Sequence, residues 1–318
     1  METEMSAAPA PPPATAHLVF FNNRGLRAGW RLLIFIGIVA ALGICMFAVI
    51  QAFTRAVGAS RGAAAAPTPG RILLGEVLSF LVVALATWIM SRIERRATDV
   101  YGLPLRRNSW SSFFTGYVLW GFLPLTLLLL AMRGLGVFFL DGLALRGSDI
   151  VYFAALWGLT FLFVGLLEEY LFRGYALFTL ADGMGFWPAA IVLALLFGYV
   201  HMSNNGESRV GILDVCLFAV FAAVTLRLTG NLWMAVGAHA GWDWGQSFVY
   251  GVSDSGNPAV GHLLNSRVQG PDWLSGGSVG PEGSVLSSVT LVLMILAFIV
   301  IYRRRQPAST NGTTTDYT

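Results

Sequence analysis

The ten residues GLLEEYLFRG, at positions 165–174, bring Glu168, Glu169 and Arg173 to the end of a very apolar segment. The eighteen residues before Glu168 contain no charged side chain. A charged side chain at the centre of a bilayer costs about 2.5–3.5 kcal/mol on insertion scales. Three such side chains within six residues are therefore expected to face a protein interior or a water-filled cavity rather than lipid.

The composition of the whole chain is that of a membrane protein. Of its 318 residues, 56% are hydrophobic and 12% are charged, whereas about 25% of the residues of a soluble domain are charged. The mean hydropathy is +0.67, and hydrophobic runs long enough to cross a bilayer recur along the sequence. The sequence predicts an all-α polytopic membrane protein with about eight transmembrane helices. It contains no basic stripe interleaved with aromatic residues, so we expect no nucleic-acid partner.

The apolar runs and the polar segments between them define the expected organisation. Transmembrane helices are expected at about 32–53, 71–91, 110–132, 150–178, 186–202, 211–228, 231–250 and 284–302. Glu76 and Asp214, which stand near the starts of two of these helices, are expected at the membrane interface. The chain divides into a disordered tail with an interfacial segment (1–31), the first three spans (32–149), a core of four spans (150–250), a loop with the last span (251–302) and a polar tail (303–318).

The arginines indicate how the spans are oriented. Twelve fall on the side of the N-terminus, seven fall on the opposite side, and Arg173 lies within a span. Because cytoplasmic loops carry an excess of basic residues, both termini of this multi-pass chain are expected in the cytoplasm. The protein would lie in the cell membrane, in contact with its lipids, with the loop at 251–283 facing outward.

Two further spans carry ionisable side chains. The sequence FGYVH places Phe197 and His201 on one helical face, and HAGWD does the same for His239 and Asp243. Small residues surround His239 and allow helices or a substrate backbone to come close. These side chains can therefore meet the glutamates of the opening stretch inside the membrane.

The two glutamates of GLLEEYLFRG have different surroundings on a helix. Glu169 and Arg173 are four residues apart and can form an ion pair. Glu168 points about 100° away round the helix, so its charge is left unbalanced. A partner for Glu168 is then expected on another span.

The three motifs, in this order and on separate apolar spans, resemble those of the CAAX-protease and bacteriocin-processing family of intramembrane proteases (CPBP, or Abi). EEYLFR matches the motif E-E-x-x-x-R, FGYVH matches F-x-x-x-H, and HAGWD matches H-x-x-x-[N/D]. Each motif is short, whereas all three in order make a strong signal. The resemblance covers about residues 150–250. It implies a membrane-embedded hydrolase, a protease that acts on a peptide or protein, including one associated with the membrane.

The resemblance also implies roles for individual residues. Glu168, helped by His201, would activate a water for attack on the scissile carbonyl group. His239 and Asp243 would stabilise the oxyanion that forms. The residues that would hold this site in place are Glu169, Arg173 and Phe197.

Asp243 stands where the family often has asparagine. An ionised aspartate cannot donate to an oxyanion, so Asp243 would be protonated, orient His239 or bind a metal. Glu168, His201, His239 and Asp243 form a set that could ligate zinc with one position open. No HExxH motif demands zinc. We expect a metal-independent mechanism without a cofactor, and zinc-dependent hydrolysis is its alternative.

Two other classes of function fit the same residues. A catalytically silent scaffold or immunity-type membrane protein would use the motifs as a structural polar network. A proton-coupled transporter would use the glutamates and histidines as a relay, although no internal repeat supports a transporter. Cleavage of peptides separates the protease from both alternatives.

The depth of the two central residues conflicts with the expected span boundaries. At 1.5 Å per residue, Glu168 lies roughly 15 Å from the cytoplasmic end of the fourth span, and His201 lies roughly 20 Å from that end of the fifth. The two side chains can meet only if the span ends shift by several residues or the helices tilt.

Overall fold

The computed structural model describes residues 19–22, 25–56, 68–204, 206–257 and 260–304. The expected disordered tail at the N-terminus and most of the polar C-terminal tail lie outside these residues, as does most of the first interhelical loop.

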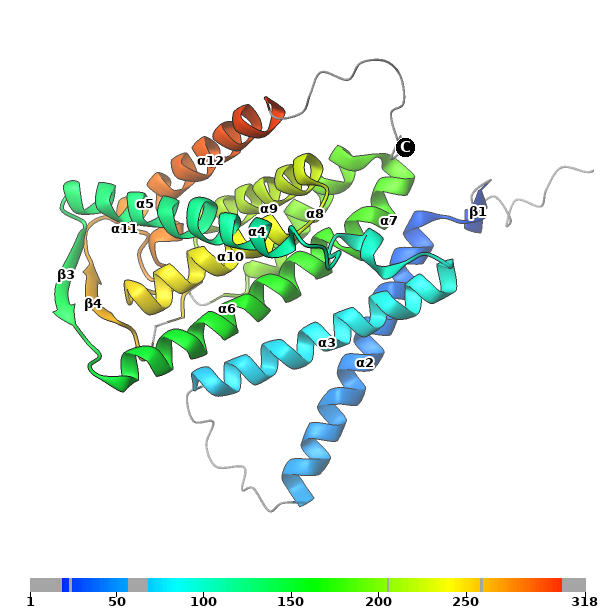
Figure 1. Cartoon of the computed structure of the whole chain (residues 1–318), viewed down its shortest axis with the longest axis horizontal. Coiled ribbons are helices and arrows are strands. Elements are labelled where there is room, and N and C mark those ends of the chain that lie inside the picture. Colours follow the sequence, from blue (N-terminus) through cyan, green and yellow to red (C-terminus); the bar gives the residue numbers. More distant parts are fainter. Residues whose placement is uncertain (1–18, 23–24, 57–67, 205, 258–259, 305–318) are drawn as a thin grey trace, which may run out of the picture.

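Helices make up most of the described chain, and two short antiparallel strand pairs complete it (Figure 1). The longer helical elements, in chain order, are α2 (Ala28–Ala56), α3 (Pro69–Glu94), α4 (Ser109–Thr115), the π-helix η2 (Gly116–Phe122), α5 (Leu123–Gly134), α6 (Ser148–Arg173), α7 (Tyr175–Met184), α8 (Phe186–His201), α9 (Arg209–Thr229), α10 (Trp233–Asp243), the π-helix η3 (Trp244–Val249) and α12 (Val285–Arg303). The short elements are β1 (Phe21–Asn22), β2 (Gly25–Leu26), η1 (Thr98–Tyr101), β3 (Phe138–Leu143), β4 (Leu264–Val268), α11 (Asp272–Ser275) and η4 (Pro281–Gly283).

The prediction of an all-α polytopic membrane protein is confirmed. Among the described residues, six helical segments are long and apolar enough to cross a membrane: Ala28–Ala56, Pro69–Glu94, Ser109–Gly134, Ser148–Met184, Arg209–Thr229 and Val285–Arg303. Helix α8 is also apolar but has only 16 residues, and α10 continues into η3 with a change of helical pitch. The count of eight spans therefore stays a prediction.

Helix α10 lies at the centre of the bundle and packs on α4, η2, α6 and α9 (Figure 1). Its glycines allow this close packing. A Cβ atom added at Gly237 would collide with the carbonyl oxygen of Phe113, and one added at Gly241 would collide with that of Tyr117. Close approach through small residues is a common way for membrane helices to associate. It places His239, which lies between the two glycines, in the middle of the protein.

Segments that were expected on the same side of the membrane contact one another. Strand β3 follows α5 and pairs antiparallel with β4 in the long loop before α12, with Phe138 opposite Val268. At the other end of the bundle, Arg31 of α2 donates to Glu94 of α3 and to Asp182 of α7, each over 2.9 Å. The contacts do not say which end faces the cytoplasm, so the orientation stays a prediction.

A methyl group at Gly241 should destabilise the bundle. The change Gly241→Ala pushes Cβ into the backbone of Tyr117, and overpacking of this kind costs about 1–3 kcal/mol. The matched control is Gly37→Ala in α2, where no atom lies within 4 Å of the added carbon. Thermal unfolding in detergent should show a lower Tm for Gly241→Ala alone. Equal Tm values for the two variants would contradict this account of the helix contact.

Candidate active site

The turn between α7 and α8 brings Glu168 and His201 to the same depth. Gly185 forms this turn with φ +85°, a conformation that glycine adopts readily. Glu168 stands seventeen residues before Gly185 and His201 stands sixteen residues after it. The fourth span was expected to end at about 178, and helical structure extends beyond it, after a break at Gly174, to Met184. Glu168 and His201 meet in the folded chain, so the depth conflict of the expected boundaries does not arise.

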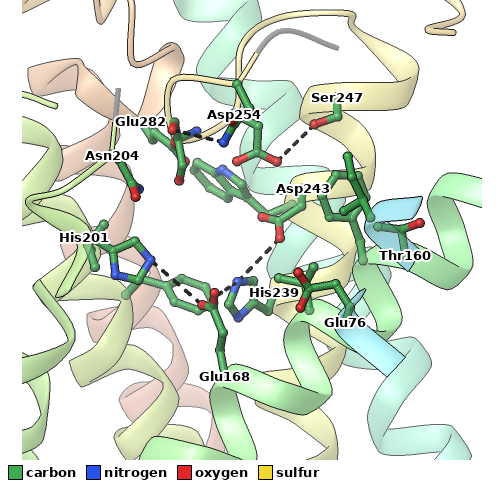
Figure 2. Close-up of a pocket in the computed structure, with 18 of the residues that line it drawn as sticks. Glu76, Thr160, Glu168, His201, Asn204, His239, Asp243, Ser247, Asp254 and Glu282 are labelled. Carbon is green, nitrogen blue, oxygen red and sulfur yellow. Dashed lines mark hydrogen bonds and ion pairs between the residues drawn. The ribbon is translucent and has the colours of Figure 1, made fainter. Parts of the chain in front are cut away.

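Glu168 faces both intramembrane histidines. Its Oε2 atom lies 4.0 Å from Nε2 of His201 and 3.7 Å from Nε2 of His239 (Figure 2). The three side chains come from α6, α8 and α10, and each is partly accessible from a shared cavity. Both distances exceed that of a direct hydrogen bond, so a small molecule can sit beside the carboxylate and the rings.

The orientation of His201 is set by its own helix. Its Nδ1 atom lies 2.8 Å from the carbonyl oxygen of Phe197. A carbonyl oxygen only accepts hydrogen bonds, so Nδ1 carries the hydrogen. In the neutral ring, Nε2 is then a free acceptor, and it is the nitrogen that faces Glu168.

His239 lies among three carboxylates. Its Nδ1 atom is 3.0 Å from Oε1 of Glu169, and its Nε2 atom is 3.4 Å from Oδ2 of Asp243. Together with Glu168, these groups surround the ring on both nitrogens. The contact between Glu169 and His239 was not foreseen from the sequence, because it depends on the register between α6 and α10.

Arg173 connects the supporting residues. Its Nη1 atom lies 3.5 Å from Oε1 of Glu169, and the two side chains are 3% and 0% exposed. The guanidinium group also lies 4.4 Å from the ring centre of Phe197, which is a cation–π distance. The Phe197 ring in turn packs edge-on against His201, with ring centres 4.4 Å apart. The expected pair of Glu169 and Arg173 is present, and it reaches both histidines.

Glu168, His201, His239 and Asp243 line a cavity of about 670 Å³, which is a typical size for a ligand site. Its apolar walls include Trp157, Phe161 and Phe218. Its acidic side chains are Glu76, Glu168, Asp214, Asp243, Asp254 and Glu282.

Glu76 and Asp214, which were expected at the membrane interface, both line the cavity, and Asp214 is 2% exposed. Their depth in the membrane stays a prediction. Asp254 and Glu282 were missed altogether (Figure 2). They lie in a loop rich in glycine and serine, which has no periodicity that could indicate where it folds.

The zinc-ligand set named from the sequence is not assembled as a metal site. In the part of the chain that the structure describes, no three His, Cys, Asp or Glu side chains are arranged to hold one metal ion. Zinc-dependent hydrolysis stays an untested alternative.

The fold and the site together define a class of protein. It is a helical membrane protein in which carboxylate and histidine side chains surround an internal cavity. A family model, type II CAAX prenyl endopeptidase Rce1-like, matches residues 150–245. Residues 150–245 therefore form a CPBP-family domain, as the motifs indicated, and this domain is of the CAAX-protease type. No curated protein and no solved structure matches the chain.

The match ends before the loop that contributes Asp254 to the cavity. Burial raises the pKa of Asp254 to about 6, and nearby Glu168 adds to the rise. Hydrogen bonding from Ser247 and the proximity of His239 offset part of it. Because the ordinary pKa is 3.8, the folded protein holds this proton more tightly than the unfolded chain does. Stability from this group is therefore lost as the pH rises from about 4 to about 6.

The change Asp254→Asn should accordingly stabilise the protein in a pH-dependent way. At pH 8 the Tm in detergent should rise by about 2–6 °C, and the gain should shrink towards zero near pH 4. Asparagine can still accept from Ser247, so the local hydrogen bond is kept. The control is Asp272→Asn, which changes an exposed carboxylate of the same loop. A pH-independent gain for Asp254→Asn would contradict the argument.

Proposed function

We propose that this chain is an intramembrane endopeptidase that hydrolyses a peptide bond with a water activated by Glu168 and His201. The observation that carries the proposal is the approach of Glu168 Oε2 to both histidines, 4.0 Å from His201 and 3.7 Å from His239, inside one cavity. Membership of a family of CAAX proteases supports an endopeptidase in general. The mechanism below is the part that we add.

The attacking water would lie between Glu168 and His201. The carboxylate and the free Nε2 of His201 are both acceptors, so one water can donate a hydrogen to each. Glu168 takes the proton as the water oxygen bonds to the scissile carbonyl carbon. It then passes the proton to the leaving amine nitrogen as the carbon–nitrogen bond breaks. This is general base and then general acid catalysis by one carboxyl group.

His239 would stabilise the oxyanion. As an imidazolium it donates from Nδ1 to Glu169 and offers its Nε2–H to the developing negative charge. Asp243 lies 3.4 Å from this nitrogen. Of the roles considered for Asp243, orienting His239 is the one that its position favours. Glu169, Arg173 and Phe197 then serve as positioning residues that hold both rings.

The surroundings of the site suit a substrate in or near the membrane. The cavity lies within a bundle whose outer helices expose large apolar side chains, such as Phe47 and Phe53 of α2. We propose that lipids cover these helices, that the chain lies in the cell membrane with both termini in the cytoplasm, and that its substrate is a peptide or protein held at the membrane. The distribution of arginines supports this orientation.

Glu168→Gln and His201→Gln should each lower the rate of peptide cleavage by at least about 100-fold, because each removes a group that activates the water. The assay is digestion of a peptide library by the full chain in liposomes, read by mass spectrometry. The matched controls are Glu207→Gln and His262→Gln, which change residues outside the cavity lining. Insertion and Tm should stay unchanged in all four variants. Full activity of Glu168→Gln would contradict the proposed mechanism. Lower stability with no cleavage by any form would favour the silent scaffold.

Chelation should leave cleavage unchanged. In the proposed reaction the base is a carboxylate and the oxyanion donor is an imidazolium, so no step uses a metal. The measurement compares cleavage rates before and after dialysis against EDTA and 1,10-phenanthroline. A loss of activity that Zn²⁺ restores would instead identify Glu168, His201, His239 and Asp243 as zinc ligands.

A further inference from the structure

The cavity has an unusual charge balance for a site inside a membrane protein. Six carboxylic side chains line it, and no arginine or lysine is among its described lining residues. The only basic groups in its wall are the rings of His201 and His239. A carboxylate removed from water is costly unless a positive charge accompanies it.

Arg173 does not supply the missing positive charge. It is 3% exposed, pairs with Glu169 and lies over the ring of Phe197. Neither Arg173 nor Glu169 lines the cavity. The positive charge of Arg173 therefore does not neutralise the carboxylates that line the cavity.

Two buried polar atoms of the cavity wall have no partner among the described residues. Oδ2 of Asp214, a residue 2% exposed, accepts no hydrogen bond, although its other oxygen accepts one from Ser288. The hydroxyl of Ser287, a residue 0% exposed, lies beside Asp214 but makes no hydrogen bond of ordinary distance and angle. Both residues line the cavity. Buried polar atoms are rarely left in this state, so a ligand that donates hydrogen bonds fits this part of the wall.

Two of the six carboxylates come from the loop before α12, and each accepts a hydrogen bond that holds it in place. Asp254 accepts from Ser247 over 3.0 Å, and Glu282 accepts from the backbone N–H of Ser255 (Figure 2). Gln246 fixes the start of the loop by donating to the carbonyl oxygen of Ser253 over 2.7 Å. The loop lies outside the residues that the family model matches, so it is a feature of this chain beyond the shared domain.

We propose that Asp254 and Glu282 form a subsite for a cationic side chain, an arginine or lysine of the peptide substrate close to the bond that is cut. The inference rests on the proposed function and adds its substrate class. The carboxylates are spread over the cavity wall and do not converge on one point as metal ligands do. A spread of acceptors suits a guanidinium or ammonium group that donates several hydrogen bonds. A peptide would bring that group to the wall when its backbone reaches Glu168.

The test compares two peptide libraries that differ at one position. That position is arginine in one library and citrulline, its uncharged near-isostere, in the other, and all remaining positions are random. With EDTA present, the full chain in liposomes should cleave the arginine library about tenfold faster. In the double variant Asp254→Asn/Glu282→Gln, which keeps both hydrogen-bond acceptors, the ratio should fall to about twofold or less. Cleavage of the citrulline library by the same variant is the internal reference for this ratio.

The control variant is Asp272→Asn, which removes one exposed carboxylate of the same loop outside the cavity lining. It should keep the full preference for arginine. Equal cleavage of the two libraries by the unaltered chain, or a preference that survives in the double variant, would overturn the subsite and leave the protease function standing.

A binding measurement separates the subsite from the reaction. Immobilised Glu168→Gln protein should retain the arginine library over the citrulline library, and the added double change should abolish that preference. Equal retention of the libraries overturns the subsite whether or not cleavage occurs. Retention of arginine peptides without cleavage by the unaltered chain supports the subsite and contradicts the proposed function.

Discussion

The carboxylate of Glu169 is fully buried in an apolar bundle, and the arrangement of the site depends on how its charge is met. Its Oε1 atom lies 3.5 Å from Arg173 of the same helix and 3.0 Å from His239 of α10. Leaving such a charge without a partner costs several kcal/mol, so α10 must lie beside α6 at this level. Arg173 extends the constraint to α8, because it packs on the ring of Phe197. One buried charge thus relates three helices.

Both histidines are anchored through Nδ1 and present Nε2 to Glu168. His201 is held by the Phe197 carbonyl oxygen and His239 by Glu169. Adjacent residues on a helix point about 100° apart, which is why Glu169 can face the protein interior while Glu168 faces the cavity. The two glutamates therefore have different roles. Glu169 is neutralised and positions the rings, and Glu168 faces the cavity, where a substrate can bind.

The sequence predicted the membrane fold and the grouping of Glu168, His201, His239 and Asp243. Ionisable side chains are costly in lipid, so those on apolar spans are expected to face one another inside the protein. The ion pair of Glu169 and Arg173 could also be predicted, because the two residues are four positions apart on one helix. Individual contacts that depend on the register of two helices, or on the loop before α12, were not predicted. The hydrogen bond between Glu169 and His239 is of the first kind, and the positions of Asp254 and Glu282 are of the second. The fifth span was expected to begin at 186, where α8 begins, whereas the helical residues of α7 after 178 were not foreseen.

The turn at Gly185 has a consequence for how the chain can vary. His201 ends α8, which runs without a break from the turn at Gly185. One residue inserted between Gly185 and His201 would move His201 by about 1.5 Å along the helix and rotate it by about 100° relative to Glu168. The number of residues in α8 is therefore constrained by the site, whereas the segments that join other spans can vary in length.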